Sequence, residues 1–352
     1  MYLGTLILFL LLCLPGSISI FTDFDLVRPW KRAWGSEGIV PYIKIDGQTN
    51  NGPNCSAAAA FGYSVAVIGD LDGNGVDDIV VGAIGENAVD NGDVMIGAGG
   101  IYVMFMSVNG SVLRHVHISH LENGGPRLIA ADQFGYSVAA LGDLDGDSIP
   151  DIAVGAPAIA LSSVYVLYLK VDGTVKDYTL IRGVYGSGSN ATTTFGNFTY
   201  TPNGPPISYG SRFGTAVTAL GDMDGDGVTE LAVSSINSGG GLSKVFIIFI
   251  TRNSTMKSYT EFGPGVAGGP DIPTAFTGFG GALLTMPDFD GDNVSELVVG
   301  ARFMDDPGSL NRRAGKSYFC FLHANGTIKR FTEHGEWSLG VNQAMPNVVS
   351  DS

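Results

Sequence analysis

The chain has 352 residues, 45% of them hydrophobic, so it is long enough to bury the core of one large all-β domain or of two ordinary ones. Only 15% of the residues are charged while 51 are glycines, a composition that suits many short strands joined by tight turns and argues against disorder. The formal net charge of −15 argues against nucleic acid or an anionic membrane surface as a partner, because both need clustered Lys and Arg; a cationic partner fits better.

The chain opens with an apolar run, Leu3 to Leu14, which ends at Pro15 and Gly16 and is followed by small residues. This run is shorter than the roughly 20 apolar residues of a membrane span. The small residues are placed for cleavage after about Ser19. We therefore expect residues 1–19 to be a signal peptide, residues 20–352 to form a secreted or cell-surface chain, and the mature chain to contain no membrane span.

Two cysteines, Cys55 and Cys320, would remain after removal of residues 1–19. A disulfide between them would join the two ends of a circular fold. Alternatively, Cys320 is a buried strand residue, because it lies in an aromatic run, Tyr318 to Phe321. The sequence leaves both possibilities open.

The chain also carries seven Asn-X-Ser/Thr sequons, and a eukaryotic secretory pathway would glycosylate some of them. The alternative is chance, since Ser, Thr and Asn are common here, and a glycan at Asn293 would be unwelcome because this residue lies in an acidic loop described below. The sequons begin at Asn54, Asn109, Asn190, Asn197, Asn253, Asn293 and Asn325.

One unit occurs four times, opening with Phe-Gly at Phe61, Phe134, Phe213 and Phe279, with spacings of 73, 79 and 66 residues. Each unit continues with an apolar stretch, an acidic loop, a second apolar stretch, an aromatic and β-branched run, a turn and another strand. No segment has the 3.6-residue periodicity of a capped helix. We therefore predict an all-β fold, a β-propeller of four-stranded antiparallel blades, with its repeats starting near residues 61, 134, 213 and 279.

The connections are less well determined by the sequence. Asn109, Asp172 and Asn325 suggest two-residue hairpin turns with positive-φ residues. The segment Gly183 to Arg212 is expected to be an exposed excursion. Val40 to Ile45 resembles the last strand of a repeat and could complete or overlay the final blade, so the sequence leaves the closure of the ring open.

The acidic loops offer oxygen ligands at alternating positions, the pattern by which a loop folds around one hard cation. The residues at positions 1, 3, 5 and 9 are Asp70, Asp72, Asn74 and Asp78; Asp143, Asp145, Asp147 and Asp151; Asp222, Asp224, Asp226 and Glu230; Asp288, Asp290, Asp292 and Glu296. The expected fifth donor is the main-chain carbonyl at position 7, which belongs to Val76, Ile149, Val228 and Val294.

These donors predict about four Ca²⁺ sites, because Zn²⁺ would require His or Cys and Mg²⁺ prefers to keep several waters. Ordinary turn chemistry is the alternative, but it does not explain the same ligand spacing in all four repeats. Position 6 is a residue that readily takes positive φ in three loops; Ser148 is the exception, where Pro150 could fix the backbone instead.

The Phe-Gly openings, the acidic loops and the Gly-Ala-Pro at Gly155 to Pro157 resemble the FG-GAP repeats of the integrin α-subunit N-terminal propeller, over roughly residues 40 to 335. This resemblance implies propeller blades, calcium in the loops on one face, and binding of partner subunits and extracellular ligands on the opposite face. Gly-Ala-Pro is complete only in the second repeat, and only four repeats are clear, which makes an integrin-type heterodimer doubtful.

No Gly-X-Ser-X-Gly elbow, phosphate loop or Cys/His pair marks an enzyme. His115, His117 and His120 could form a transition-metal site, but solvated imidazoles on an outer strand are the simpler interpretation. We therefore expect a non-catalytic, calcium-binding adhesion or ligand-binding module with an extracellular protein or glycan as partner. The alternatives are an accessory propeller of a secreted or surface enzyme complex and a structural, calcium-stiffened surface protein.

Overall fold

The computed structural model describes residues 12–14, 17–21, 42–47, 49–56, 58–158, 161–185, 193–195, 198–200, 203–208, 210–237, 243–264, 266, 268–270, 277–304 and 315–335. Every helix or strand assigned within these residues is a β-strand, as the sequence predicted. No helix in this part of the chain is long and apolar enough to cross a membrane.

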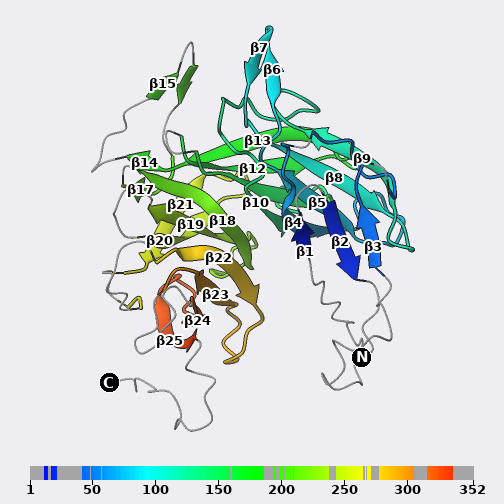
Figure 1. Cartoon of the computed structure of the whole chain (residues 1–352). Helices are drawn as coiled ribbons and strands as arrows, with labels where there is room; N and C mark the ends of the chain where they lie inside the picture. Colours follow the sequence, from blue (N-terminus) through cyan, green and yellow to red (C-terminus); the bar gives the residue numbers. More distant parts are fainter. Residues whose placement is uncertain are drawn as a thin grey trace.

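Four antiparallel sheets of four strands each form the body of the molecule, and each sheet is made by one of the four sequence repeats (Figure 1). The first contains β4 (Phe61–Gly69), β5 (Asp78–Ala83), β8 (Gly100–Met106) and β9 (Val112–Ile118). The second contains β10 (Ser137–Gly142), β11 (Asp151–Ala156), β12 (Ser163–Leu169) and β13 (Val175–Arg182). The third contains β18 (Ser211–Gly221), β19 (Glu230–Asn237), β20 (Lys244–Ile250) and β21 (Met256–Phe262), and the fourth β22 (Phe279–Met286), β23 (Glu296–Ala301), β24 (Lys316–Leu322) and β25 (Ile328–Gly335).

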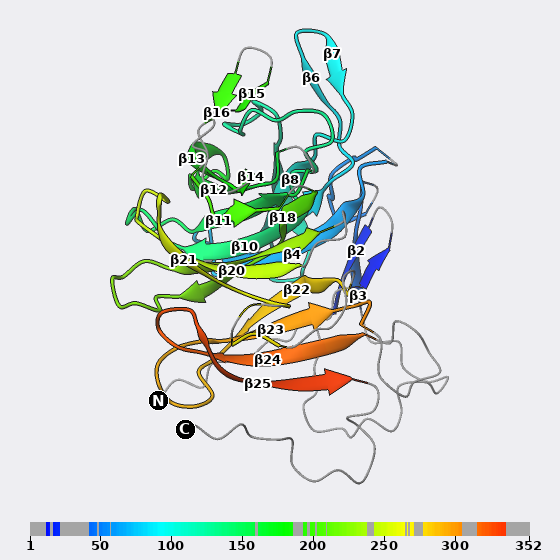
Figure 2. The ribbon, with the colours of Figure 1, turned by 90° about the vertical axis from the view of Figure 1, so that its left-hand side faces the viewer.

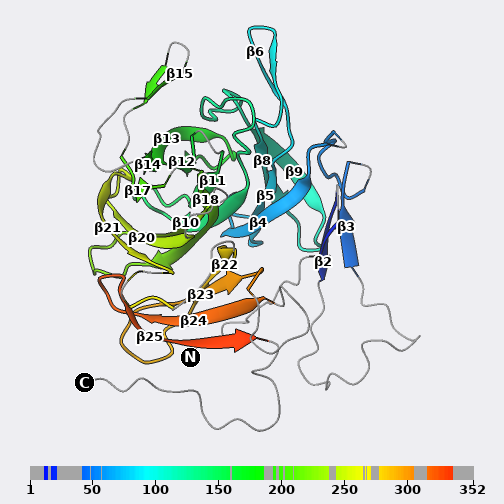
Figure 3. The same ribbon diagram turned by 60° about the vertical axis from the view of Figure 1, so that its left-hand side comes forward.

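Successive sheets face one another as propeller blades do. Their first strands β4, β10, β18 and β22 contact each other in chain order and gather about a common centre, while the fourth strands β9, β13, β21 and β25 lie at the periphery (Figure 3). The predicted fold, a β-propeller of four-stranded antiparallel blades, is confirmed.

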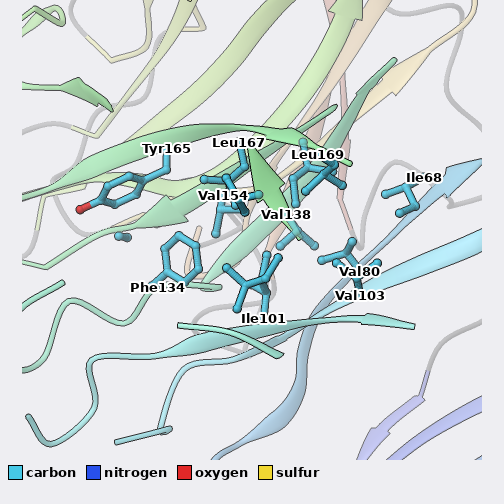
Figure 4. Close-up of a cluster of buried hydrophobic side chains, with 14 of the residues drawn as sticks. Ile68, Val80, Ile101, Val103, Phe134, Val138, Val154, Tyr165, Leu167 and Leu169 are labelled. Carbon is cyan, nitrogen blue, oxygen red and sulfur yellow. The ribbon is translucent and has the colours of Figure 1, made fainter. Parts of the chain in front are cut away.

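A layer of buried hydrophobic side chains fills each space between neighbouring blades. Figure 4 shows the layer between the first and second blades, where Ile68, Val80, Ile101 and Val103 meet side chains of the second blade such as Val154. Similar layers join the second blade to the third and the third to the fourth. A blade therefore stabilises its fold by burying its faces against its neighbours.

The Phe-Gly opening of each repeat has a structural cause. The Phe ring is buried and meets an aromatic ring of the third strand edge to face, at centroid distances of 5.5 to 5.9 Å in the four blades. The following glycine has positive φ, for example 90° at Gly135, and a Cβ there would lie 2.5 Å from the carbonyl oxygen of Gly100 in the preceding blade. The pair thus places a ring in the core and lets two blades approach closely.

The middle strands are buried on both faces in the first three blades, as in β5 and β11. The fourth blade differs, because Val298 and Phe319 on its middle strands are only half-buried. The second residue of the acidic loop differs in the same way. In the first three blades this residue is buried (Leu71, Leu144 and Met223), whereas in the fourth blade it is Phe289, which is 60% exposed.

Smaller elements lie outside the blades. They are the sheet of β1 (Leu12–Leu14), β2 (Ser17–Phe21) and β3 (Tyr42–Ile45), the hairpin of β6 (Ala88–Asp90) and β7 (Asp93–Met95), the parallel pair of β14 (Val184–Tyr185) and β17 (Pro206–Ile207), and the hairpin of β15 (Thr193–Phe195) and β16 (Phe198–Tyr200). The β6–β7 hairpin stands clear of the four sheets (Figure 2).

The segment that was suggested to complete the final blade does not do so where the structure describes it. β3 pairs with β2, and Ile45 packs in the hydrophobic cluster of the first blade. Most of residues 1–19 lies outside the described part of the chain, so their removal as a signal peptide stays a prediction. The sequons Asn190 and Asn197 of the Gly183 to Arg212 excursion also lie outside it.

Two further expectations are settled by the structure. Both Cys55 and Cys320 are free thiols, and Cys320 is buried in β24, so the buried-strand interpretation is the one that holds. The hairpin turns are not of the two-residue type, because Gly110, Gly173 and Gly326 have positive φ while the preceding Asn or Asp residues do not. A register shift accompanies each of these turns, as between Phe105 and Met106.

Candidate metal centres

The four acidic loops occupy equivalent places in the four blades. Each loop joins the first strand to the second, as residues 70–77 join β4 to β5. Since the strands alternate in direction, the turn between the third and fourth strands lies at the same end of the blade. The predicted metal loops and these hairpin turns therefore share one end of the propeller.

Each loop is wound tightly by residues with positive φ at positions 4 and 6. At position 6 the φ values are 85° for Gly75, 68° for Ser148, 79° for Gly227 and 67° for Asn293. Ser148 is therefore no exception, and the proposal that Pro150 replaces the positive φ was wrong. The second repeat tolerates the cost of a left-handed Ser because its loop has the same hydrogen bonds as the others.

The carboxylate at position 1 caps its own loop. Asp143 accepts hydrogen bonds from the main-chain N–H groups of Gly146, Asp147 and Ser148 at 2.7 to 2.9 Å. The same three contacts recur for Asp70, Asp222 and Asp288. Because these bonds hold the main chain around the carboxylate, the loop is organised by the side chain at its own position 1.

The carboxylate at position 9 is fully buried in every loop. In the first loop, Asp78 Oδ2 accepts the N–H of Leu71 at 2.9 Å and Oδ1 accepts the N–H of Met106 at 2.8 Å, which ties the loop to the third strand. Burial raises the pKa of Asp151 to about 6 and that of Glu230 to about 7, and neighbouring carboxylates of the same loop contribute in the same direction. The buried acid is thus poorly solvated as an anion and would gain from a bound cation.

The structure brings three of the predicted ligands together in each loop. One carboxylate oxygen from each of positions 1, 3 and 9 lies within 4.8 Å of the other two. These sets are Asp70, Asp72 and Asp78; Asp143, Asp145 and Asp151; Asp222, Asp224 and Glu230; Asp288, Asp290 and Glu296. Among the described residues no such group contains His or Cys.

The residues at positions 5 and 7 are bonded to each other. The main-chain N–H at position 7 donates to Oδ1 at position 5, at 2.8 to 3.0 Å from Asn74, Asp147, Asp226 and Asp292. The second oxygen of the three Asp side chains points elsewhere: Oδ2 of Asp147, Asp226 and Asp292 contacts the ammonium of Lys176, Lys257 and Lys329, respectively. The sequence analysis missed these lysines, although each is the second residue of its fourth strand, a regularity visible in the aligned repeats.

The donor set fits Ca²⁺, which takes six to eight oxygen ligands from carboxylates, carbonyls and water. One observation points to a missing partner: Oε1 of Glu230 is buried and has no hydrogen-bond partner, although Oε2 accepts the N–H of Met223 at 2.7 Å. A buried, unpartnered carboxylate oxygen is costly unless a cation or donor reaches it. If Ca²⁺ were bound, positions 1, 3 and 9 would hold it with their carboxylates and position 7 with its carbonyl.

The three histidines have other contacts. The ring of His115 meets that of Tyr102 edge to face, with centroids 6.0 Å apart. His117 Nδ1 lies 2.9 Å from Glu122 Oε2, and its ring stacks on Tyr102 at 4.5 Å. His120 is buried and bonded to the main chain of Leu128, so it is not the solvated imidazole that was expected.

Comparison with known proteins agrees with this geometry. Residues 134–167 match the FG-GAP repeat family. Integrin alpha ina-1 of Caenorhabditis elegans is 35% identical over 183 residues, which is 50% of this chain, and integrin alpha-V of Gallus gallus is 30% identical over 292 residues, or 81% of this chain. This chain is an FG-GAP repeat protein that resembles integrin α subunits. Integrin alpha-5 of Xenopus laevis is 28% identical over 282 residues, or 78% of this chain, and supports the same resemblance.

The matches cover 15%, 24% and 23% of these three relatives, so the FG-GAP repeat protein corresponds to a small part of each. Among solved structures, the rhamnogalacturonan lyase YesW overlaps with a TM-score of 0.36 at 13% identity, covering 76% of this chain and 48% of that one. So loose an overlap carries no argument about activity.

Proposed function

We infer that this protein is an extracellular, calcium-binding propeller that binds another extracellular protein or a glycan and catalyses no reaction. The observation that carries this proposal is the fourfold recurrence of a three-carboxylate group at the same end of the blades. The unpartnered oxygen of Glu230 supports it, because that oxygen is suited to a cation.

Calcium would act as a structural element of the propeller. Without metal, each loop holds three carboxylates within 4.8 Å of one another, and like charges at this distance repel. A bound Ca²⁺ would remove that repulsion and stiffen the connection between the first and second strands of each blade.

The opposite end of the blades is the side on which a partner is expected to bind. There the connection from β5 to β8 carries the β6–β7 hairpin, whose Val89 and Val94 are exposed, and Ile96, which directly follows β7, is 70% exposed. Exposed apolar side chains grouped on one projecting hairpin are typical of contact surfaces. The resemblance to integrin α subunits, which implies ligand binding opposite the calcium loops, supports the same side.

A calcium titration by calorimetry on the metal-stripped full chain, with thermal melts in the presence and absence of Ca²⁺, tests the proposal. We expect about four sites and a higher melting temperature with calcium. Asp145→Ala and Asp224→Ala should each lower the number of bound ions by about one, because each removes a ligand from one group. Asp177→Ala, on the exposed face of β13, is the matched control.

An unchanged number of bound ions in Asp145→Ala and Asp224→Ala would reject the site assignment. Binding to cells or matrix that disappears on chelation would support the adhesion role. Hydrolytic or lyase activity in the purified protein would contradict the non-catalytic one.

A further inference from the structure

In three of the four acidic loops, a lysine from the fourth strand of the same blade contacts the loop carboxylates. The Nζ of Lys176 lies 2.6 Å from Asp145 Oδ2 and also contacts Asp147 Oδ2. Lys257 lies 3.1 Å from Asp224 and contacts Asp226, and Lys329 lies 3.2 Å from Asp290 and contacts Asp292. Each ammonium therefore bridges the carboxylates at positions 3 and 5 of its loop.

The first loop lacks both the lysine and the position-5 carboxylate of this bridge. The second residue of its fourth strand is Leu113, which is 55% exposed, and position 5 is Asn74. The Nδ2 of Asn74 donates to the carbonyl oxygen of Met106 at 3.1 Å, so a main-chain acceptor takes the place of the ammonium. Asp at position 5 thus occurs with Lys on the fourth strand, and Asn occurs with Leu.

This pairing gives the same formal charge at five equivalent positions of every loop and its blade. Counting positions 1, 3, 5 and 9 together with the second residue of the fourth strand, the second, third and fourth loops each have four carboxylates and one ammonium, a formal charge of −3. The first loop has three carboxylates and no ammonium in the same places, which is also −3; outside these places it carries one more carboxylate, the exposed Asp77 at position 8. In the fourth loop, Arg330 adds a more distant positive charge, 4.0 Å from Asp290.

We propose that Lys176, Lys257 and Lys329 are built-in counter-ions that let the four-carboxylate loops fold without metal and that weaken the binding of a divalent cation in these loops. The proposal rests on the proposed calcium binding and adds to it a residue that sets the affinity of each site. The first loop has Asn74 in place of the fourth ligand-position carboxylate and has no lysine at the equivalent place of its fourth strand.

The physical argument predicts effects of opposite sign in the two states. Without metal, the ammonium attracts two carboxylates that would otherwise repel each other, so it stabilises the loop. With metal, the same ammonium lies beside a ligand of a doubly charged cation and repels that cation. All three lysines are partly exposed, so solvent screens both effects.

Lys176→Met and Lys257→Met in the full chain test the proposal, because Met keeps most of the apolar stem and removes the charge. We expect the melting temperature of the metal-stripped protein to fall by a few °C and the calcium affinity of one site in each variant to rise roughly tenfold. Lys170→Met is the control: this exposed lysine forms no ion pair among the described residues, and its replacement should change neither quantity.

The first loop offers the reverse experiment. Asn74→Asp alone should create a loop with carboxylates at positions 1, 3, 5 and 9 and no counter-ion, which lowers the metal-free melting temperature and tightens calcium binding. Adding Leu113→Lys should return both quantities toward those of the unmodified protein. This rescue would not occur if the two substitutions acted independently.

The outcomes separate this inference from the proposed function. Unchanged metal-free melting together with unchanged or weaker calcium binding in Lys176→Met and Lys257→Met would overturn the counter-ion role. If the unmodified protein bound no calcium while the lysine variants still melted at lower temperature, the proposed function would fail and the counter-ion role in the metal-free loop would be supported.

Discussion

The ring of Phe134 meets the ring of Tyr165 edge to face, with centroids 5.5 Å apart and an interplanar angle of 79°. Phe134 opens the second repeat and is fully buried in the layer between the first and second blades. Phe134→Ala should therefore lower the free energy of unfolding by about 3 to 5 kcal/mol, through lost burial and a cavity. Chemical denaturation measures this loss, and Val108→Ala, at a position that is 93% exposed, should change the stability by less than about 0.5 kcal/mol.

Gly135→Ala tests the close approach of two blades. Both Gly135 and Gly92 have positive φ, at 90° and 93°, but an added Cβ at Gly135 would lie 2.5 Å from the carbonyl oxygen of Gly100, whereas one at Gly92 meets nothing within 4 Å. Gly92→Ala should lower the free energy of unfolding by only about 1 to 2 kcal/mol, the cost of placing a non-glycine residue in the left-handed conformation. Gly135→Ala should cost clearly more, and equal losses for the two variants in denaturant melts would contradict the steric argument.

The metal-stripped protein should become more stable as the pH falls from about 7 to about 5. Burial raises the pKa of Glu230 to about 7 and that of Asp151 to about 6, so the folded chain binds protons more tightly than the unfolded chain in this range. The contribution of Glu230 has an upper limit of about 3 kcal/mol. Thermal melts across this pH range measure the slope, and Glu230→Gln should flatten it.

Calcium should reverse this dependence, because a metal-loaded loop needs its carboxylates ionised. At lower pH a second effect takes over: the lysine contacts lower the pKa of Asp147 and Asp226, so their stabilisation is lost as the pH falls through those lowered values. A metal-stripped protein whose stability increases as the pH is raised from 5 to 7 would contradict the raised pKa values of Glu230 and Asp151.

Glycosylation should concentrate at the hairpin turns between third and fourth strands. Asn109, Asn253 and Asn325 are exposed at equivalent turns of three blades, at the end that carries the acidic loops. In protein secreted from a eukaryotic host, each Asn→Gln change there should lower the mass by one glycan. Asn293→Gln should leave the mass unchanged, since Asn293 lies inside an acidic loop; a glycan on Asn293 and none at the turns would contradict this distribution.

Much of this architecture could be predicted because the information is local and repeated. The Phe-Gly openings, the loop spacing and the apolar runs are contiguous in the sequence, so they predicted the four sheets correctly. The carboxylates of positions 1, 3 and 9 lie together in each loop, while their role as metal ligands stays a prediction. The buried environment of Asp78 could also be anticipated in part, because it is the first residue of an apolar strand.

Features that depend on distant residues could not be predicted in this way. Lys176 is 29 residues from Asp147, and only the pairing of β12 with β13 brings the lysine back to the loop. The partner of β3 and the left-handed conformation of Ser148 depend likewise on the surrounding structure, which overrides local preference.

The exposure of Phe289 has a consequence for how the molecule unfolds. In a chain of modules that contact only their neighbours, each interface acts as a separate coupling energy, and a module with fewer buried contacts opens first. Because Val298 and Phe319 are only half-buried, the fourth blade is the module with fewer buried contacts and should open first. Amide hydrogen exchange should accordingly be fastest in β22–β25 and slowest in the second blade, so that the propeller frays from one side instead of opening all at once.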